Sequence, residues 1–137
     1  MADRIRRVDY CYVEVPDRPG EGARVLGGLQ EQGVSLLSMT AFPTSGGKSQ
    51  IDLVAASGDL EKAAQKAGLK LSAKKRALFV TGADRPGAVA AIFKKLADAK
   101  INVTAANAAC GETGFGMIVW VKPADVDAAA KALGATG

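Results

Sequence analysis

The alternation of apolar and polar residues along the chain predicts short strands and helices in a definite order. In the first strand Cys11, Val13 and Val15 fall on one face and polar residues on the other, which is typical of a half-buried strand. Apolar residues at helical spacing follow, and then two strands joined by a glycine-containing turn. The expected elements are a strand at 8–16, a helix after residue 20, strands at 34–42 and 48–55, a helix at 59–67 and a strand at 69–72.

The same order of elements occurs a second time along the chain. The tetrapeptide Asp-Arg-Pro-Gly at 17–20 recurs at 84–87, and this offset also aligns Val13 with Val80 and Ile51 with Ile118. Agreement of a tetrapeptide, an apolar pattern and an element order indicates an internal duplication, with modules at 1–73 and 74–137. The second copy predicts a strand at 77–83, a helix after residue 87, strands at 101–109 and 115–122, and a helix at 124–133, with no residues left for most of a last strand.

The repeated tetrapeptide predicts the start of a helix. Aspartate is a favoured N-cap and proline a favoured first-turn residue. The first N–H groups of a helix lack partners within it, so they also suit a ligand carboxylate, and Gly20 and Gly87 leave the backbone approachable. Helix capping and ligand binding both remain open for these residues.

A βαββαβ module with Asp-Arg-Pro-Gly after its first strand resembles an ACT domain, as does Ile101-Asn102-Val103 opening the second strand. The resemblance implies an α+β fold of two ferredoxin-like modules, with antiparallel sheets and helices on one face. It implies a regulatory protein that binds an amino acid or related carboxylate, commonly where two domains pair. In the first copy Ser35 stands where the family often carries asparagine.

The ligand site is expected to combine the loop with the start of the following strand in each copy. Arg18 and Arg85 either pair with a ligand carboxylate or are solvated, and Asn102 either contacts ligand or forms a local turn. The expected ligand-binding residues are Asp84, Arg85, Gly87, Ala88, Ile101, Asn102 and Val103 in the second copy, and Asp17, Arg18, Gly20, Ser35 and Leu36 in the first.

The composition of the chain excludes some classes of catalytic and metal site. The 137 residues are 48% hydrophobic and 23% charged with a net charge of +4, and they include no histidine, which removes His-activated nucleophiles and His-containing metal sites. We therefore expect no catalytic residue, metal or cofactor. A small enzyme on the same fold and an RNA-binding module are the alternatives, although the RNA-binding signature of a basic residue followed by Gly-aromatic-Gly is missing.

The two cysteines, Cys11 and Cys110, are far apart in sequence, so no disulfide framework is expected and both are interpreted as small buried side chains. Trp120 is interpreted as a core residue. No secretion signal or membrane-spanning run is found, which favours the cytoplasm.

The last strand missing from the second copy predicts an unpaired edge on the strand at 77–83. Natural sheets seldom leave such an edge free. We expect residues 69–75 to continue into that strand as one long strand shared by both modules, and we expect a homodimer.

Overall fold

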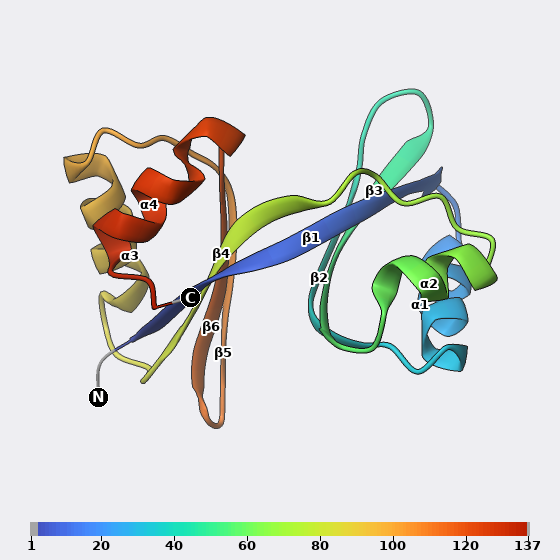
Figure 1. Cartoon of the computed structure of the whole chain (residues 1–137), viewed down its shortest axis with the longest axis horizontal. Coiled ribbons are helices and arrows are strands. Elements are labelled where there is room, and N and C mark those ends of the chain that lie inside the picture. The colour runs from blue at the N-terminus through green and yellow to red at the C-terminus, as the bar shows by residue number, and fades with distance from the viewer. Residues whose placement is uncertain (1–2, 137) are drawn as a thin grey trace. The chain divides into compact units, whose positions relative to one another are not determined.

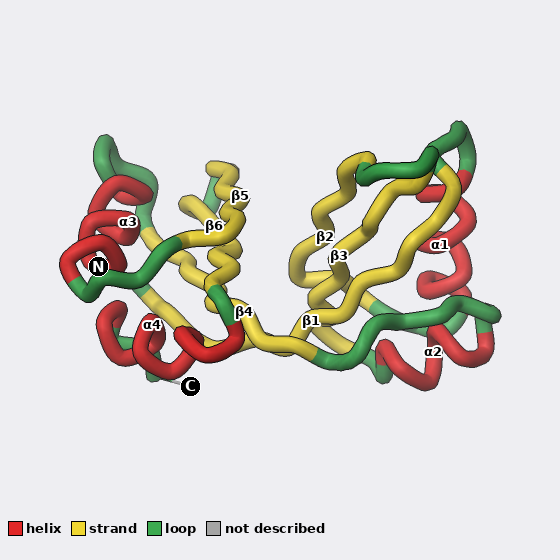
Figure 2. The backbone as a smooth tube through the Cα atoms, turned by 90° about the horizontal axis from the view of Figure 1, so that it is seen from above, coloured by secondary structure: helices red, strands yellow, loops and turns green. Residues whose placement is uncertain are grey.

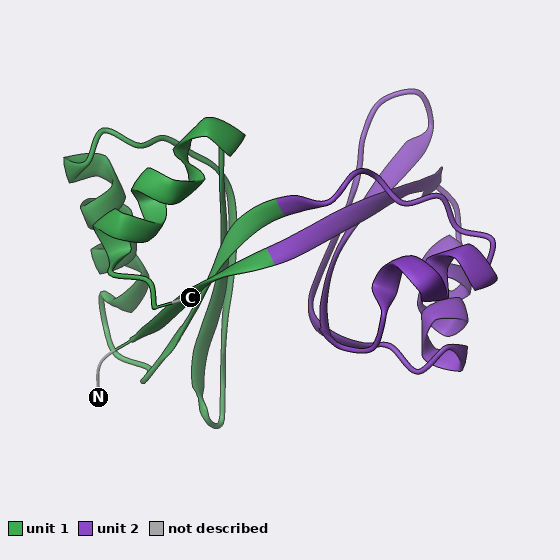
Figure 3. Ribbon diagram, viewed as in Figure 1, with its two compact units in different colours: residues 1–8, 76–137 green, residues 9–75 purple. Residues whose placement is uncertain are grey.

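The computed structural model describes residues 3–136, which fall into two compact units (Figure 3). Unit 1 comprises residues 1–8 and 76–137, and unit 2 comprises residues 9–75. The strands and α-helices, labelled in Figure 1, are β1 (Arg4–Pro16), α1 (Glu21–Glu31), β2 (Ser35–Pro43), β3 (Lys48–Ser57), α2 (Leu60–Lys66), β4 (Lys75–Gly82), α3 (Ala88–Asp98), β5 (Val103–Gly111), β6 (Gly114–Val121) and α4 (Val126–Leu133). A 3-10 turn, η1 (Pro123–Asp125), directly precedes α4.

In unit 2 the strands are hydrogen-bonded in the order β2-β3-β1, with both pairs antiparallel, and α1 and α2 cover one face (Figure 2). The alternation predicted for the first strand is confirmed, because Cys11, Val13 and Val15 are all buried. Val25 and Leu29 of α1 are buried against that face. The apolar period of two on the strands thus meets the apolar stripe of the helix.

In unit 1 the strand order is β1-β4-β6-β5, and α3 and α4 cover one face (Figure 2). Leu78, Val80, Ile92 and Leu96 are among the buried residues of its core. Phe93 is 40% exposed, because the buried stripe of α3 follows Ala88, Ile92 and Leu96. The α+β class with βαββαβ-like modules is confirmed.

Strand β1 supplies residues to both units. Its first part, through Val8, belongs to unit 1, where Ile5 is only 5% exposed within the core, and the remainder belongs to unit 2. The last strand missing from the second copy is therefore provided by the start of the chain. The predicted modules, 1–73 and 74–137, differ from the compact units mainly in these first eight residues.

The expected strand at 69–72 does not form, and β4 begins only at Lys75, so residues 69–74 do not extend it. That segment lies beside β1, where the Ser72 N–H donates to the Tyr12 carbonyl oxygen at 2.8 Å. The Tyr12 N–H donates in return to the Ser72 hydroxyl at 2.9 Å rather than to a backbone carbonyl. A side chain thus takes the place of a ladder partner, which ends regular pairing there. The long strand is β1 and not the predicted one.

The two cysteines differ in environment. Cys11 is 3% exposed, as predicted, whereas Cys110 is exposed, so the prediction that it is buried was wrong. Cys110 lies on β5, an edge strand that is half-exposed or exposed along its whole length. Trp120, on the neighbouring β6, is 7% exposed, in agreement with its prediction as a core residue. Among the described residues no helix is long and apolar enough to cross a membrane.

Candidate functional site

Both tetrapeptide loops lead into a helix, but the residue that begins each helix is the glycine. Gly20, with φ 93°, and Gly87, with φ 83°, are the N-cap residues of α1 and α3 and adopt the left-handed conformation. Of the two interpretations left open, capping by the aspartate side chain is therefore not found in either helix. Asp17 instead accepts a hydrogen bond from the Ser49 hydroxyl at 2.9 Å. A left-handed N-cap position favours glycine, which explains why the tetrapeptide ends in that residue.

Neither α1 nor α3 has a side chain capping its N-terminus. At the start of α3, the Ala88 N–H donates to the Arg85 carbonyl oxygen at 3.2 Å, and the Ala91 N–H donates to the Gly87 carbonyl oxygen at 2.9 Å. The space where a Cβ of Gly87 would lie has no atom within 4 Å. The positive end of the helix is therefore approachable from solvent, as an anion-binding helix start requires.

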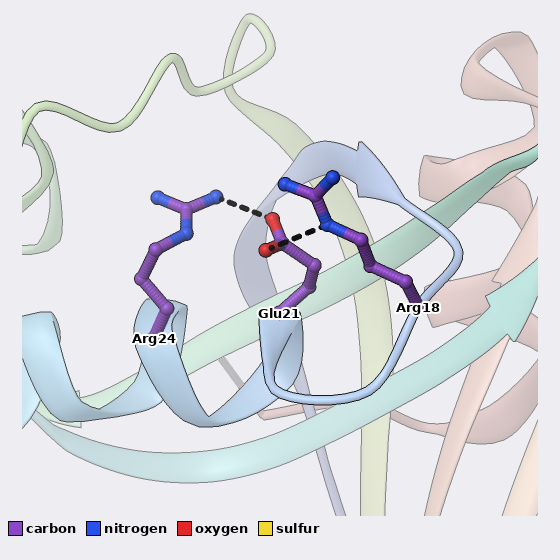
Figure 4. A network of polar contacts seen from close by, with 3 residues as sticks. All are labelled: Arg18, Glu21 and Arg24. Atoms are coloured by element: carbon purple, nitrogen blue, oxygen red, sulfur yellow. Dashed lines mark hydrogen bonds and ion pairs between the residues drawn. The ribbon is translucent and has the colours of Figure 1, made fainter.

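In unit 2 the loop arginine is already paired with a carboxylate of its own chain (Figure 4). Glu21 accepts hydrogen bonds from Arg24 Nη2 at 3.0 Å and from Arg18 Nε at 3.5 Å. The hydrogen bond from Arg24 contributes most to lowering the pKa of Glu21, and Arg18 lowers it further. This internal carboxylate lies in the first turn of α1, where a ligand carboxylate would bind.

In unit 1 the equivalent first-turn position is Ala88, which is buried and carries no charge. Arg85 pairs elsewhere, donating to Asp3 Oδ1 at 3.1 Å and to Asp3 Oδ2 at 3.0 Å. It also donates to the Ala83 carbonyl at 3.0 Å. The start of α3 therefore has no acidic side chain in its first turn, which distinguishes it from α1.

Asp84 lies at the same end of the unit 1 sheet as the end of β5. Its exposed carboxylate is close enough to the Cys110 thiol for a side-chain hydrogen bond, which is the main cause of a raised pKa of that thiol. Asp84 belongs to the loop that leads into α3, and it places a negative charge near the end of β5. For a zwitterionic ligand, the Asp84 carboxylate is an acceptor for the ammonium group, and the N–H groups at the start of α3 are donors to the carboxylate.

The structure separates the two halves of the predicted site within unit 1. Gly82, before the loop, pairs with Phe115, whereas Val103 pairs with Val121, six residues further along β6. At about 3.3 Å per residue this separation is roughly 20 Å. The expectation that loop and strand start lie together in one copy was wrong, because α3 carries the chain back along β4 to the opposite end of the sheet. Ile101 is buried and Asn102 is exposed there.

Unit 2 shows the same separation. Pro16, before the loop, pairs with Lys48, whereas Leu36 pairs with Ala55 at the other end of β3. Ser35 is exposed, and Leu36 is half-buried against the core of the unit. In neither unit, therefore, do the predicted residues form one continuous pocket.

A polar cluster on the face of unit 2 away from its helices was not expected from the sequence. Asp52 is 7% exposed, pairs across the sheet with Tyr12 and Thr40, and accepts a hydrogen bond from Gln50 at 3.0 Å. Desolvation raises the pKa of Asp52, while the Gln50 hydrogen bond and the charge of Lys75 oppose the rise. An aspartate within an apolar strand was the signal that could have revealed it.

Within residues 3–136 no group of three or more acidic, cysteine or histidine side chains is arranged to hold a metal ion. The exposed features are helix starts, one free thiol at Cys110 and polar loops.

Comparisons with known proteins agree with the fold. Residues 76–136 match the family model of the ACT domain. No curated protein matches the chain by sequence. Among solved structures, the regulatory subunit of aspartate kinase from Thermus thermophilus, in its ligand-free form, is similar with 17% identity and a TM-score of 0.66, over 97% of this chain and 93% of that chain.

Two further structures are similar over nearly the whole chain. Protein BT0572 from Bacteroides thetaiotaomicron shows 12% identity and a TM-score of 0.79, over 95% of this chain and 88% of that chain. The regulatory subunit of aspartate kinase from Thermus flavus shows 18% identity and a TM-score of 0.62, over 97% of this chain and 94% of that chain. At these identities the likeness is one of fold.

Proposed function

We propose that this protein is a regulatory protein of two ACT-like modules that binds a small carboxylate, with amino acids as the ligand class, and that it is not an enzyme. The observation that carries the proposal is the start of α3, which has no side-chain cap, has no acidic side chain in its first turn and has open space beside Gly87. It lies within the part of the chain that matches the ACT-domain model. The similarity to regulatory subunits of aspartate kinase supports a regulated enzyme as the partner.

The proposed contacts follow from charge. The ligand carboxylate docks at the first N–H groups of α3, and its ammonium group faces Asp84. Arg85 contributes when it releases Asp3, and the missing side chain at Gly87 leaves room for the ligand. The equivalent loop of unit 2, Asp17 to Gly20, binds more weakly, because Glu21 already occupies the start of α1.

We further propose a homodimer, now on a different edge from the one that the sequence suggested. The edge of β4 is covered by β1, whereas β5 is the outer strand of unit 1 and contains no charged residue and no proline. Such an edge is suited to pairing with another chain. Pairing with a second copy of β5 in antiparallel orientation would bring Asn102 of one chain near Asp84 of the other. Asn102 directly precedes β5, and Asp84 lies beside Cys110 at the other end of that strand.

A composite site of this kind explains why loop and strand start are far apart within one unit. It assigns Ile101, Asn102 and Val103 to the ligand bound at the loop of the second chain. In unit 2, Ser35 and Leu36 hold the corresponding position. We also propose a cytoplasmic location, supported by the free exposed thiol of Cys110.

A thermal-shift screen of the common amino acids tests the proposal. A ligand at one hundred times its dissociation constant stabilises the folded state by about 2.7 kcal/mol, so a real ligand raises the melting temperature clearly. Asn102→Ala is the informative variant, because Asn102 is exposed and its loss costs little stability. Gly87→Val is less informative, since φ 83° strains a branched residue. If no amino acid shifts melting at millimolar concentration, the proposal is wrong.

A further inference from the structure

A cavity of about 410 Å³ opens on the face of the unit 1 sheet that is turned away from α3 and α4. It lies where β4 ends and the β5–β6 turn begins, and its volume falls within the roughly 300–1,000 Å³ typical of small-molecule sites. Its lining includes Arg4, Thr81, Ala109, Gly111, Thr113 and Gly116.

The cavity exists because the side chains on this face of the sheet are small where β4 ends and β6 begins. Thr81, Gly116 and Ala109 form one row across β4, β6 and β5. Two residues further along the strands, on the same face, the row contains Phe79 and Ile118. Large side chains fill that row, and the change to glycine at the centre of the next row leaves a hollow beside them.

Nothing in the backbone requires glycine at position 116. Gly116 has no positive φ, and a Cβ placed there would meet its nearest atom, Phe79 Cζ, at an ordinary contact distance of 3.9 Å. Gly114 differs, since its φ is 130° and a Cβ would collide with the Gly82 carbonyl oxygen. The small residue at 116 therefore keeps the floor of the cavity open without serving the fold.

Arg4 brings a positive charge to the cavity. It lies two residues before Arg6 on β1, and so on the same face, where the Arg6 guanidinium is 5.5 Å from the centre of the Phe79 ring. Arg7 and Arg85 are paired with Asp127 and Asp3. Within residues 3–136, by contrast, no acidic side chain forms an ion pair with Arg4.

The wider charge of unit 1 also favours an anion. Unit 1 contains ten Lys or Arg residues and six Asp or Glu residues, whereas unit 2 contains eight of each, so the whole net charge of +4 belongs to unit 1. Glu112 lies in the β5–β6 turn but is exposed and does not line the cavity. A guanidinium without a carboxylate partner at the rim of a hollow suits a carboxylate ligand.

We propose that this cavity is a second binding site, for a small monocarboxylate with a short apolar chain. The Arg4 guanidinium pairs with the carboxylate, the hydroxyl groups of Thr81 and Thr113 donate hydrogen bonds to it, and the apolar chain lies over Gly116 against Phe79. The site is distinct from the α3 start proposed above, because it lies on the opposite face of the sheet and uses none of the same side chains.

An NMR titration with sodium butyrate at constant ionic strength tests this site. We expect saturable shifts of the backbone amide signals of Thr81, Gly111 and Gly116, and no such shifts with butyramide, which has the same shape without the charge. Absence of saturable shifts with butyrate overturns the proposal. Shifts of these amides with inorganic phosphate but not with butyrate also overturn it, since the site would then be a phosphate site.

Variants identify the contacts. Arg4→Gln should weaken butyrate binding at least tenfold, because a hydrogen-bonded charged group contributes that much or more. Arg7→Gln is the matched control and should leave affinity unchanged, since Arg7 pairs with Asp127. Gly116→Val should abolish binding while the protein stays folded. Equal affinity in Arg4→Gln and the original protein would refute the assignment.

The two proposed sites can be tested independently of each other. Asn102→Ala should weaken amino-acid binding at the α3 start and leave butyrate binding intact, and Gly116→Val should do the reverse. Loss of both activities in either variant would show that the cavity is not a separate site.

Discussion

The backbone N–H of Thr136 donates a hydrogen bond of 3.0 Å to the carbonyl oxygen of Ile5, so the segment after α4 meets the start of β1 in unit 1. Ile5 is buried there among residues of β4, β6 and α4. We expect Ile5→Ala to lower the free energy of unfolding of unit 1 by about 2–4 kcal/mol, because truncation of a buried isoleucine leaves a cavity. Hydrogen exchange of the β6 amides measures this loss.

Val15→Ala is the matched control for Ile5→Ala. Val15 lies on the same strand and is equally buried, but in the core of unit 2. It should increase exchange in β3 and leave β6 protected. Faster exchange in β3 than in β6 after Ile5→Ala would contradict the assignment of the first eight residues to unit 1.

Asp52 provides a prediction for pH dependence. Its pKa is raised by desolvation, so the folded state binds the proton more tightly than the unfolded state, and ionisation of Asp52 destabilises the fold. Asp52→Asn should therefore stabilise the protein by about 1 kcal/mol at pH 7. The new amide can donate to the Thr40 hydroxyl, which lies opposite and has no hydrogen-bond partner among the described residues.

The pH profile separates this effect from simple packing. The gain from Asp52→Asn should shrink as pH falls through the raised folded pKa and disappear below about pH 4, where aspartate is protonated in both states. Denaturant titrations from pH 3 to pH 8 measure it. Glu14→Gln, an exposed carboxylate on the same face, is the control and should show no such gain. A gain that is equal at every pH would count against the raised pKa.

Two adjacent glycines in α1 should respond oppositely to alanine. The position of a Cβ on Gly27 has no atom within 4 Å, whereas a Cβ on Gly28 would lie 3.1 Å from the Cβ of Ala67. Gly27→Ala should stabilise the protein by roughly 0.5–1 kcal/mol through helix propensity. Gly28→Ala should gain less or destabilise, because the end of α2 must shift. Thermal melts of the two single variants are sufficient, and an equal gain in both would refute the close contact.

The exposed edge of β5 yields a prediction about assembly. Ala106 and Ala108 are exposed on this strand, and replacing both with lysine should convert the proposed dimer to a monomer, because like charges would meet across the paired edges. Light scattering after gel filtration gives the mass. Ala90→Lys with Ala91→Lys, on the exposed face of α3, adds the same charge and should leave the mass unchanged. A monomeric starting protein at tens of micromolar would exclude the dimer.

The ion pair of Arg85 with Asp3 should compete with ligand. Asp3→Asn releases the guanidinium at the loop that leads into α3. We expect tighter binding of the amino acid found in the thermal-shift screen, because Arg85 no longer needs to exchange one carboxylate for another. Calorimetric titration measures the change. Weaker binding would mean that Asp3 orders the loop in its binding form.

Features that depend on a few neighbouring residues were determined by the sequence alone. The alternation at Cys11, Val13 and Val15 predicted the strand, and the repeated Asp-Arg-Pro-Gly predicted where α1 and α3 begin. These patterns reflect the period of a strand or helix, or the backbone freedom of one glycine, and they need no knowledge of distant residues. The α+β class followed from the same local signals.

Only the tertiary structure decided how distant segments meet. Ile5 completes the core of unit 1 because it is buried among residues more than seventy positions away in the sequence. The alternating pattern of its strand is equally compatible with either unit. The separation of Gly87 from Asn102 follows from the register of β6, and the raised pKa of Asp52 follows from its burial between Tyr12 and Thr40. Packing and desolvation act between elements, so a single strand or helix pattern does not reveal them.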